Sequence, residues 1–211
     1  MRFTNQEMLF LTSVSRGRVP FGVRSHMPGE EERSAFVEET IQSLMKKGVL
    51  DEKEKLTEEG AGIIFCWEQY RNSRRHIRLN HVNAAILPDN VLITVVETEG
   101  GYEVGCIRSE VLMTKVLQYS DYMCRAETKA SRGSWSDLSE KDWEKELSEM
   151  EGAVFVSEYL SGRLTEERVY YWKKEKGYLF NRRKGRVREL SPGVMRKQLY
   201  RTLKGEMENG A

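Results

Sequence analysis

The sequence predicts an α+β fold in which a mixed or antiparallel sheet is flanked by helices. Residues 91–96 and 167–173 are rich in β-branched and aromatic residues, and each run is followed by a glycine-containing turn and a second apolar run. Residues 30–47 and 57–70 instead place apolar side chains at helical spacing. A helix-like segment follows each hairpin, so the order strand, turn, strand, helix occurs twice.

The N-terminal third is predicted to be helical. Thr4 and Glu7 have the spacing of a capping box for a helix that begins at Asn5. Gly48 is a suitable C-terminal residue for the helix over 30–47, and Thr57 is a suitable N-cap for the next helix. The apolar stripe of the helix over 30–47 consists of Phe36, Val37, Ile41, Leu44 and Met45.

Two hairpin–helix units are predicted in the rest of the chain. The first has strands at 91–96 and 102–108 and a helix at 109–119 whose inward side chains are Val111, Leu112, Val116 and Leu117. The second has strands at 167–173, 178–182 and 187–190 and a helix that begins at Ser191-Pro192. We interpret 86–117 and 168–203 as an internal, quasi-two-fold structural repeat.

A polar segment separates the two units. Residues 127–151 hold eight acids and four bases and indicate an exposed loop followed by a charged helix capped by Ser139. Residues 154–156 suit either the end of that helix or a short strand. We therefore expect a single domain over 1–211 with four parts, namely 1–78, 79–126, 127–151 and 152–211.

Charge is unevenly distributed although the formal net charge is only +1. Residues 29–62 contain ten acids and five bases, whereas residues 163–204 contain fourteen bases and four acids. The three cysteines (Cys66, Cys106 and Cys124) are far apart and match no C-x-x-C pattern, as expected of a reduced, cytoplasmic protein. Neither a signal peptide nor a membrane span is indicated.

No pattern in the sequence points to catalysis, a metal or a cofactor. His26, His76 and His81 lack carboxylate or thiolate neighbours at regular spacing and are interpreted as surface or hydrogen-bonded residues. Cys66 lies on an apolar helix face beside Trp67 and is expected to be a buried structural residue. Neither a nucleophile elbow nor a phosphate-binding loop occurs. We therefore predict a protein that is not an enzyme and has no cofactor.

Nucleic acid is an alternative partner. Residues 71–76 are basic, and residues 32–60 are similar to the winged helix of MarR- and PadR-type transcriptional regulators. The acidic balance of that region disfavours contact with phosphates. The basic strands near the C-terminus also carry Tyr170, Tyr171, Trp172, Tyr178 and Phe180, which suits a stacking platform or, more commonly, a sheet with one buried aromatic face and one solvated basic face. A basic sheet could also dock an acidic protein or residues 127–151.

The order of features resembles the EspG-type chaperones of type VII (ESX) secretion systems and their relatives in Firmicutes. The resemblance covers nearly the whole chain and is carried by three stretches: residues 3–11 followed by Val19-Pro20, the helix ending at 44–51, and Trp172 followed by Gly177-Tyr178-Leu179. It implies a mixed α/β fold with a quasi-two-fold repeat. It also implies a cytosolic chaperone that keeps a helical secretion substrate soluble, with a WXG100 or LXG protein as the expected partner of a Firmicutes relative.

A chaperone of this kind needs an exposed apolar patch rimmed by charge. Trp135 and Trp143 are candidates because the polar segment around them offers little core, although Trp143 could instead pack under its own helix. The second candidate surface is basic and consists of Arg182, Arg183, Lys184 and Arg186. An immunity protein that neutralises a toxin would need the same kind of surface and stays a further alternative; the sequence does not indicate an oligomeric state.

Overall fold

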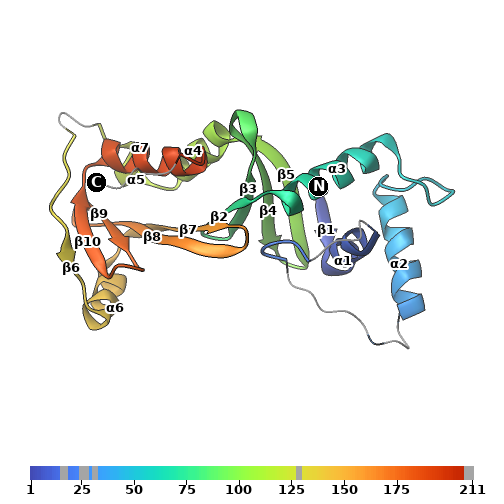
Figure 1. The fold of residues 1–211 in the computed structure, drawn as a ribbon, viewed down its shortest axis with the longest axis horizontal. Helices are drawn as coiled ribbons and strands as arrows, with labels where there is room; N and C mark the ends of the chain where they lie inside the picture. Colours follow the sequence, from blue (N-terminus) through green and yellow to red (C-terminus); the bar gives the residue numbers. More distant parts are fainter. Residues whose placement is uncertain (15–18, 24–28, 30–32, 127–129, 207–211) are drawn as a thin grey trace. The chain divides into compact units, whose positions relative to one another are not determined.

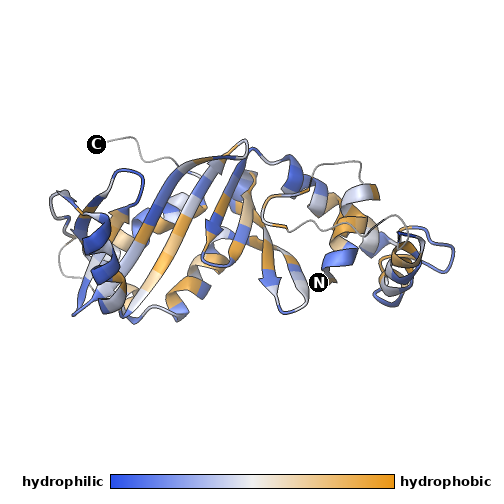
Figure 2. Cartoon of the chain, turned by 90° about the horizontal axis from the view of Figure 1, so that it is seen from below, coloured by the Kyte–Doolittle hydropathy of each residue, from blue (hydrophilic) through white to orange (hydrophobic). Residues whose placement is uncertain are grey.

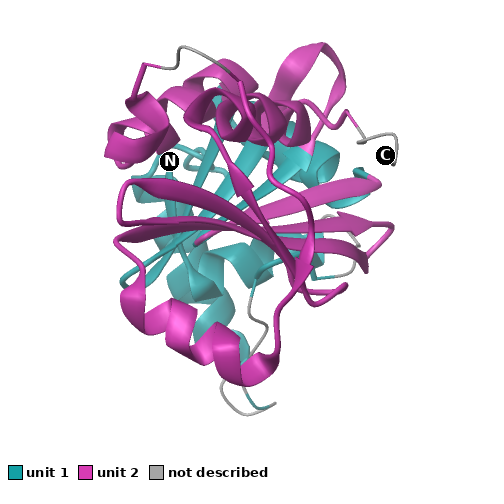
Figure 3. Ribbon diagram, turned by 90° about the vertical axis from the view of Figure 1, so that its left-hand side faces the viewer, with its two compact units in different colours: residues 1–73, 81–85, 93–106 teal, residues 74–80, 86–92, 107–211 magenta. Residues whose placement is uncertain are grey.

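The computed structural model describes residues 1–14, 19–23, 29, 33–126 and 130–206. The chain divides into two compact units, which Figure 3 colours separately. Unit 1 comprises residues 1–73, 81–85 and 93–106, and unit 2 comprises residues 74–80, 86–92 and 107–211. His26 and the first residues of the helix predicted over 30–47 lie outside the described residues.

The described residues of unit 1 form three helices and four antiparallel strands. The helices are α1 (Asn5–Val14), α2 (Arg33–Lys46) and α3 (Glu58–Asn72). The strands lie in the order β1 (Arg2–Thr4), β5 (Gly101–Arg108), β4 (Val91–Thr98) and β3 (Val82–Ile86), and the last residues of β3 and β5 and the first of β4 belong to unit 2. β1 pairs with β5 in antiparallel register, with Phe3 opposite Tyr102.

Local signals begin and end the helices of unit 1 as predicted. The Thr4 N–H donates to Glu7 Oε2 at 2.7 Å and the Glu7 N–H donates to Thr4 Oγ1 at 3.1 Å, which is a reciprocal capping box. The Thr57 hydroxyl accepts from the Gly60 N–H at 2.9 Å at the start of α3. Gly48 follows α2 with φ +73°, a left-handed conformation that glycine adopts without a steric penalty.

The interior of unit 1 is built on buried side chains from α1, α2 and α3. Met8, Leu44 and Tyr70 are fully buried. The rings of Trp67 and Tyr70 stack at a centroid distance of 5.8 Å, and the Tyr70 hydroxyl donates to the Phe21 carbonyl at 2.7 Å. Burial raises the pKa of Tyr70, so its hydroxyl stays protonated and keeps this hydrogen bond.

Unit 2 is centred on six strands, which lie in the order β2, β7, β8, β9, β10 and β6. All the neighbouring pairs are antiparallel. β8 has a bulge where its register against β7 shifts between Glu158 and Tyr159. The bounds are β2 Arg75–Leu79, β6 Ser136–Asp137, β7 Gly152–Leu160, β8 Arg163–Lys173, β9 Lys176–Asn181 and β10 Arg186–Leu190.

Helices cover both faces of the unit 2 sheet (Figure 1). α4 (Ser109–Gln118), α5 (Asp121–Cys124) and α7 (Pro192–Leu203) pack together on one face, where the Tyr122 and Trp172 rings stack at 6.4 Å. α6 (Glu140–Glu149), which is largely hydrophilic (Figure 2), covers the other face. The predicted cap is confirmed, because the Ser139 hydroxyl accepts from the Asp142 N–H at 3.1 Å.

Several expectations are corrected by this arrangement. The basic and aromatic strands do not have one buried and one solvated face: Val169 through Trp172 are all buried, because α6 covers one face and α5 and α7 cover the other. Val111 was expected to point inward, but it is 45% exposed on α4. The strands β1, β2 and β3 were not predicted. The quasi-two-fold repeat and the single-domain organisation stay predictions.

Candidate protein-binding surface

The four predicted basic residues lie at the turn that joins β9 to β10. Asn181 shapes this turn, because its Oδ1 accepts from the Lys184 N–H at 3.0 Å. The Arg182 guanidinium pairs with Glu167 at 2.9 Å, and Arg186 Nε lies 3.3 Å from an Asp137 carboxylate oxygen. These pairs are largely exposed, so each contributes only about 0–1 kcal/mol, and the arginines can exchange partners with little loss of stability.

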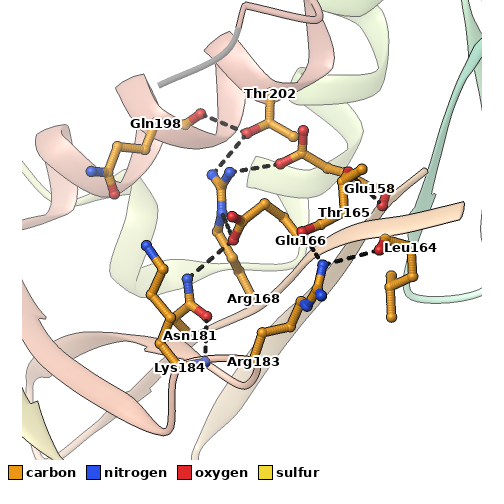
Figure 4. A network of polar contacts seen from close by, with 10 residues as sticks. All are labelled: Glu158, Leu164, Thr165, Glu166, Arg168, Asn181, Arg183, Lys184, Gln198 and Thr202. Carbon is orange, nitrogen blue, oxygen red and sulfur yellow. Dashed lines mark hydrogen bonds and ion pairs between the residues drawn. The ribbon is translucent and has the colours of Figure 1, made fainter. Parts of the chain in front are cut away.

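A polar network beneath the turn links it to the tip of the β7–β8 hairpin (Figure 4). The Arg183 guanidinium donates to the carbonyls of Leu164 and Thr165 at 3.0 and 2.6 Å. Thr165 lies at the bulge of β8, and its hydroxyl donates to the Glu158 carbonyl at 3.0 Å. Arg183 therefore has a fixed position on the hairpin.

Arg168 is the central member of this network. Its guanidinium is buried, pairs with Glu158 at 2.8 Å and reaches the Thr202 hydroxyl of α7 at 3.5 Å. Glu166 lies 3.7 Å from Arg168 Nε and accepts from the Asn181 side-chain amide at 3.1 Å. Because Asn181 also holds the turn, the network connects α7, β8 and the basic turn. Removing one partner would leave an uncompensated buried charge.

Trp135 lies on the same edge of the sheet as Arg186. Residues 131–138, here called the strap, run along the outer side of β10: Arg132 forms a bridge with Leu190, and Ser136 pairs with Val187. The Arg188 guanidinium lies over the half-buried Trp135 ring at 4.3 Å, a cation–π contact. The strap thus presents an indole beside a row of arginines.

Trp143 is not part of this surface. It is 8% exposed and packs beneath α6, with its ring 4.3 Å from Phe180 and 5.9 Å, edge to face, from Tyr171. This is the alternative in which Trp143 packs under its own helix. The structure therefore places Arg182, Arg183, Lys184 and Arg186 at one turn, Trp135 beside Arg188 of β10, and Trp143 in the core.

Exposed apolar side chains on β7 and β8 were missed by the sequence analysis. Leu160 and Leu164 flank the hairpin turn and are 49% and 39% exposed. Phe155, opposite Val169 in the β7–β8 register, is 42% exposed. The only available signal was the Ser161-Gly162 pair, whose positive φ angles are those of a tight hairpin turn. Of these residues, Leu164 supplies apolar area directly beside Arg183, which donates to its carbonyl.

The remaining candidate residues do not assemble into a metal site. His76 is buried in β2 and His81 is exposed in the β2–β3 turn. Cys66 is half-buried, not fully buried as expected. In the described ranges, no three His, Cys, Asp or Glu side chains are placed to hold a metal ion. Those ranges also contain no helix with the length and apolar character needed to cross a membrane.

The charge asymmetry of the sequence follows the division into units. Unit 1 contains fifteen acidic and ten basic side chains, a formal charge of −5. Unit 2 contains eighteen acidic and twenty-four basic side chains, a formal charge of +6. A partner that contacts the basic turn of unit 2 is therefore favoured when its own surface is acidic.

Comparison with protein families places the chain in one family over its full length. The model for a domain of unknown function, DUF5081, matches residues 1–211. The chain belongs to this family. Among curated proteins, no sequence matches this DUF5081 chain.

The fold of this DUF5081 protein is similar to that of a solved secretion chaperone. The chaperone EspG5 of the Mycobacterium tuberculosis type VII secretion system, in complex with a PE25-PPE41 dimer, matches with a TM-score of 0.60. The match covers 100% of this chain and 98% of that chain at 9% sequence identity. The α+β, EspG-like fold implied by the resemblance is therefore confirmed.

Proposed function

We propose that this DUF5081 protein is a cytoplasmic chaperone or adaptor that holds a helical type VII secretion substrate, of the WXG100 or LXG kind, soluble and competent for export. The observation that carries the proposal is the end-to-end match to EspG5, a chaperone whose structure was solved with a PE25-PPE41 dimer bound. At 9% identity this match concerns the fold. The function of this chain is inferred from it together with the chemistry of the surface.

The surface formed by the strap and the basic turn fits the proposed partner. Trp135 offers a flat ring of the type enriched at the centres of protein interfaces. Arg182 is paired with the half-buried Glu167 at 2.9 Å and Arg186 with the exposed Asp137 at 3.3 Å, and a carboxylate of a partner can replace either. A helix with an apolar stripe and acidic flanks would therefore find complementary groups on this edge of unit 2.

The winged-helix alternative has little support from the described residues. α2 and α3 are present, but the first turn of α3 carries the exposed carboxylates Glu58 and Glu59. A recognition helix normally presents basic and polar side chains to DNA, because phosphates repel carboxylates. The geometry thus favours a protein partner.

Co-purification tests the proposal. The tagged chain is isolated from its native host at moderate salt with nuclease present, and the bound proteins are identified by mass spectrometry. We expect a stable complex with a helical secretion protein. Recovery of DNA in the untreated control without such a protein would contradict the proposal, and loss of a toxin's activity in the complex would indicate an immunity role instead.

Matched variants then test the surface. Trp135→Ala and the charge reversal Arg186→Glu should each weaken capture of the identified partner by about tenfold, equivalent to about 1.4 kcal/mol. The control is Lys115→Ala, which removes an exposed charge from α4 of the same unit. Equal capture by all three variants would place the interface elsewhere on the chain.

A further inference from the structure

Unit 1 contains an apolar groove that the proposed function does not use. It lies between α3 and β5, encloses about 400 Å³, and is defined here as the α3–β5 groove. Along α3 it is lined by Glu59, Gly62, Ile63 and Cys66, which are spaced as one face of a helix. The opposite wall includes Gly105 and Cys106 of β5.

Two glycines keep this groove open. Gly62 lies inside α3, where glycine destabilises a helix relative to alanine, yet a Cβ at this position would meet nothing within 4 Å. Gly105 lies inside β5, and a Cβ there would lie 3.3 Å from Thr94 Oγ1, so a modest adjustment would admit it. Packing within unit 1 therefore does not demand glycine at position 62. A glycine inside a strand often marks the close approach of another backbone.

The surroundings of the groove indicate the chemistry of its occupant. Phe65, one position before Cys66, is 61% exposed, which extends the apolar surface beyond the groove. Glu59 is the charged side chain among the lining residues, and Glu58 is exposed beside it. The Met1 ammonium already donates to the Val104 carbonyl at 2.9 Å. The carboxylates of Glu58 and Glu59, together with the formal charge of −5 on unit 1, favour a cationic partner.

We propose that the α3–β5 groove docks an amphipathic helix of a partner protein whose apolar stripe is flanked by lysine or arginine. The α3 wall spans eight residues from Glu59 to Cys66, a rise of about 10 Å, which accommodates about two turns of a partner helix. Small apolar residues of that helix approach Gly62 and Gly105, Phe65 packs along it, and its basic flank pairs with Glu59. Apolar grooves of this kind are a recurrent way to bind helices.

The cysteines of the groove provide a direct measurement. Cys66 and Cys106 line it, whereas the exposed Cys124 lies in unit 2 and serves as an internal control. The probes are two synthetic helical peptides that share one leucine-and-alanine stripe, one flanked by lysines and the other by glutamates. Alkylation of each cysteine of the full chain is followed by mass spectrometry with and without peptide.

We expect the lysine peptide to slow alkylation of Cys66 and Cys106 about tenfold and to leave Cys124 unchanged, and the glutamate peptide to have little effect. Gly62→Trp, which fills the groove, should abolish protection. Gly62→Ala should weaken protection only in part, because one methyl group narrows the groove without filling it.

Three results would overturn the proposal: no protection by either peptide, equal protection by both, or protection that persists in Gly62→Trp. Each would leave the proposed chaperone function untouched, because the co-purification and the unit 2 variants are independent of this groove.

Discussion

Two tryptophans eight positions apart allow structural and binding roles to be separated. Trp143 is 8% exposed and contacts Tyr171 and Phe180 at ring distances of 5.9 and 4.3 Å. Replacing such a buried aromatic residue with alanine costs about 3–5 kcal/mol, a large share of the 5–15 kcal/mol that stabilises a typical domain. Trp135 is half-buried, and its ring lies 4.3 Å from the Arg188 guanidinium. Trp135→Ala should therefore cost only about 0.5–1 kcal/mol.

Urea unfolding followed by far-UV circular dichroism measures both variants, and capture of the partner is then compared at a temperature where both are folded. We expect Trp143→Ala to lower the unfolding midpoint strongly and to spare binding in the molecules that remain folded. Trp135→Ala should leave the unfolding midpoint nearly unchanged and weaken capture of the partner. Two results would contradict these roles: a change of less than about 1 kcal/mol in the free energy of unfolding for Trp143→Ala, or an equal loss for Trp135→Ala and Trp143→Ala.

Three further predictions concern titratable and reactive groups. Burial opposes the charge of Glu7, but hydrogen bonds from Lys47, Ser43 and Thr4 outweigh it and lower the pKa of Glu7. Stability gained from this carboxylate is therefore present above about pH 4.5 and lost as pH falls through the lowered pKa. In urea titrations the advantage of the wild type over Glu7→Gln, about 1.5–3 kcal/mol at pH 7, should shrink as pH falls below about 4.5. Lys173→Met removes the ion pairs of Lys173 with Glu146 and Glu149 at 2.7 and 2.9 Å, and should therefore speed hydrogen exchange of the α6 amides. Unchanged exchange would show that these ion pairs do not stabilise α6 on the sheet. Burial and the neighbouring Cys106 raise the pKa of the Cys66 thiol. At pH 8 iodoacetamide should therefore modify Cys66 more slowly than the exposed Cys124. Equal rates of modification would contradict the burial of Cys66.

Much of the fold could be predicted because its signals are local. The capping box of Thr4 and Glu7, the caps at Thr57 and Ser139, and the glycine after α2 each depend on residues within one turn of the helix end. The β4–β5 hairpin and the helices α4 and α7 were likewise predicted close to their observed bounds.

The missed features depend on contacts between distant segments. β2 contains Arg75, His76 and Arg78 among its five residues, a composition that indicates a charged surface. Its partner β7 begins more than seventy positions later in the chain, and no local pattern reports that pairing. Along the C-terminal half of β8, the alternation of side chains does not distinguish a buried face from an exposed one, because helices cover both faces. Arg168 is also buried, paired with Glu158.

The candidate surface was predicted only in part, because only its local groupings are visible in the sequence. Arg182 through Arg186 stand close together in the sequence, so their grouping at one turn was visible without a structure. The sequence did not reveal that Trp143 is buried whereas Trp135 lies beside β10. This difference depends on α6 packing over Phe180 while the strap follows β10.

The strap also has a consequence for self-association. β10 would otherwise be an edge strand with a row of unpaired backbone groups, and such edges template aggregation. The strap occupies that edge: Gly133 and Leu138 donate their N–H groups to the carbonyls of Glu189 and Gly185 at 2.9 and 2.8 Å. Any change that detaches residues 131–138 should therefore expose the backbone of β10 and promote concentration-dependent self-association through this edge of the sheet.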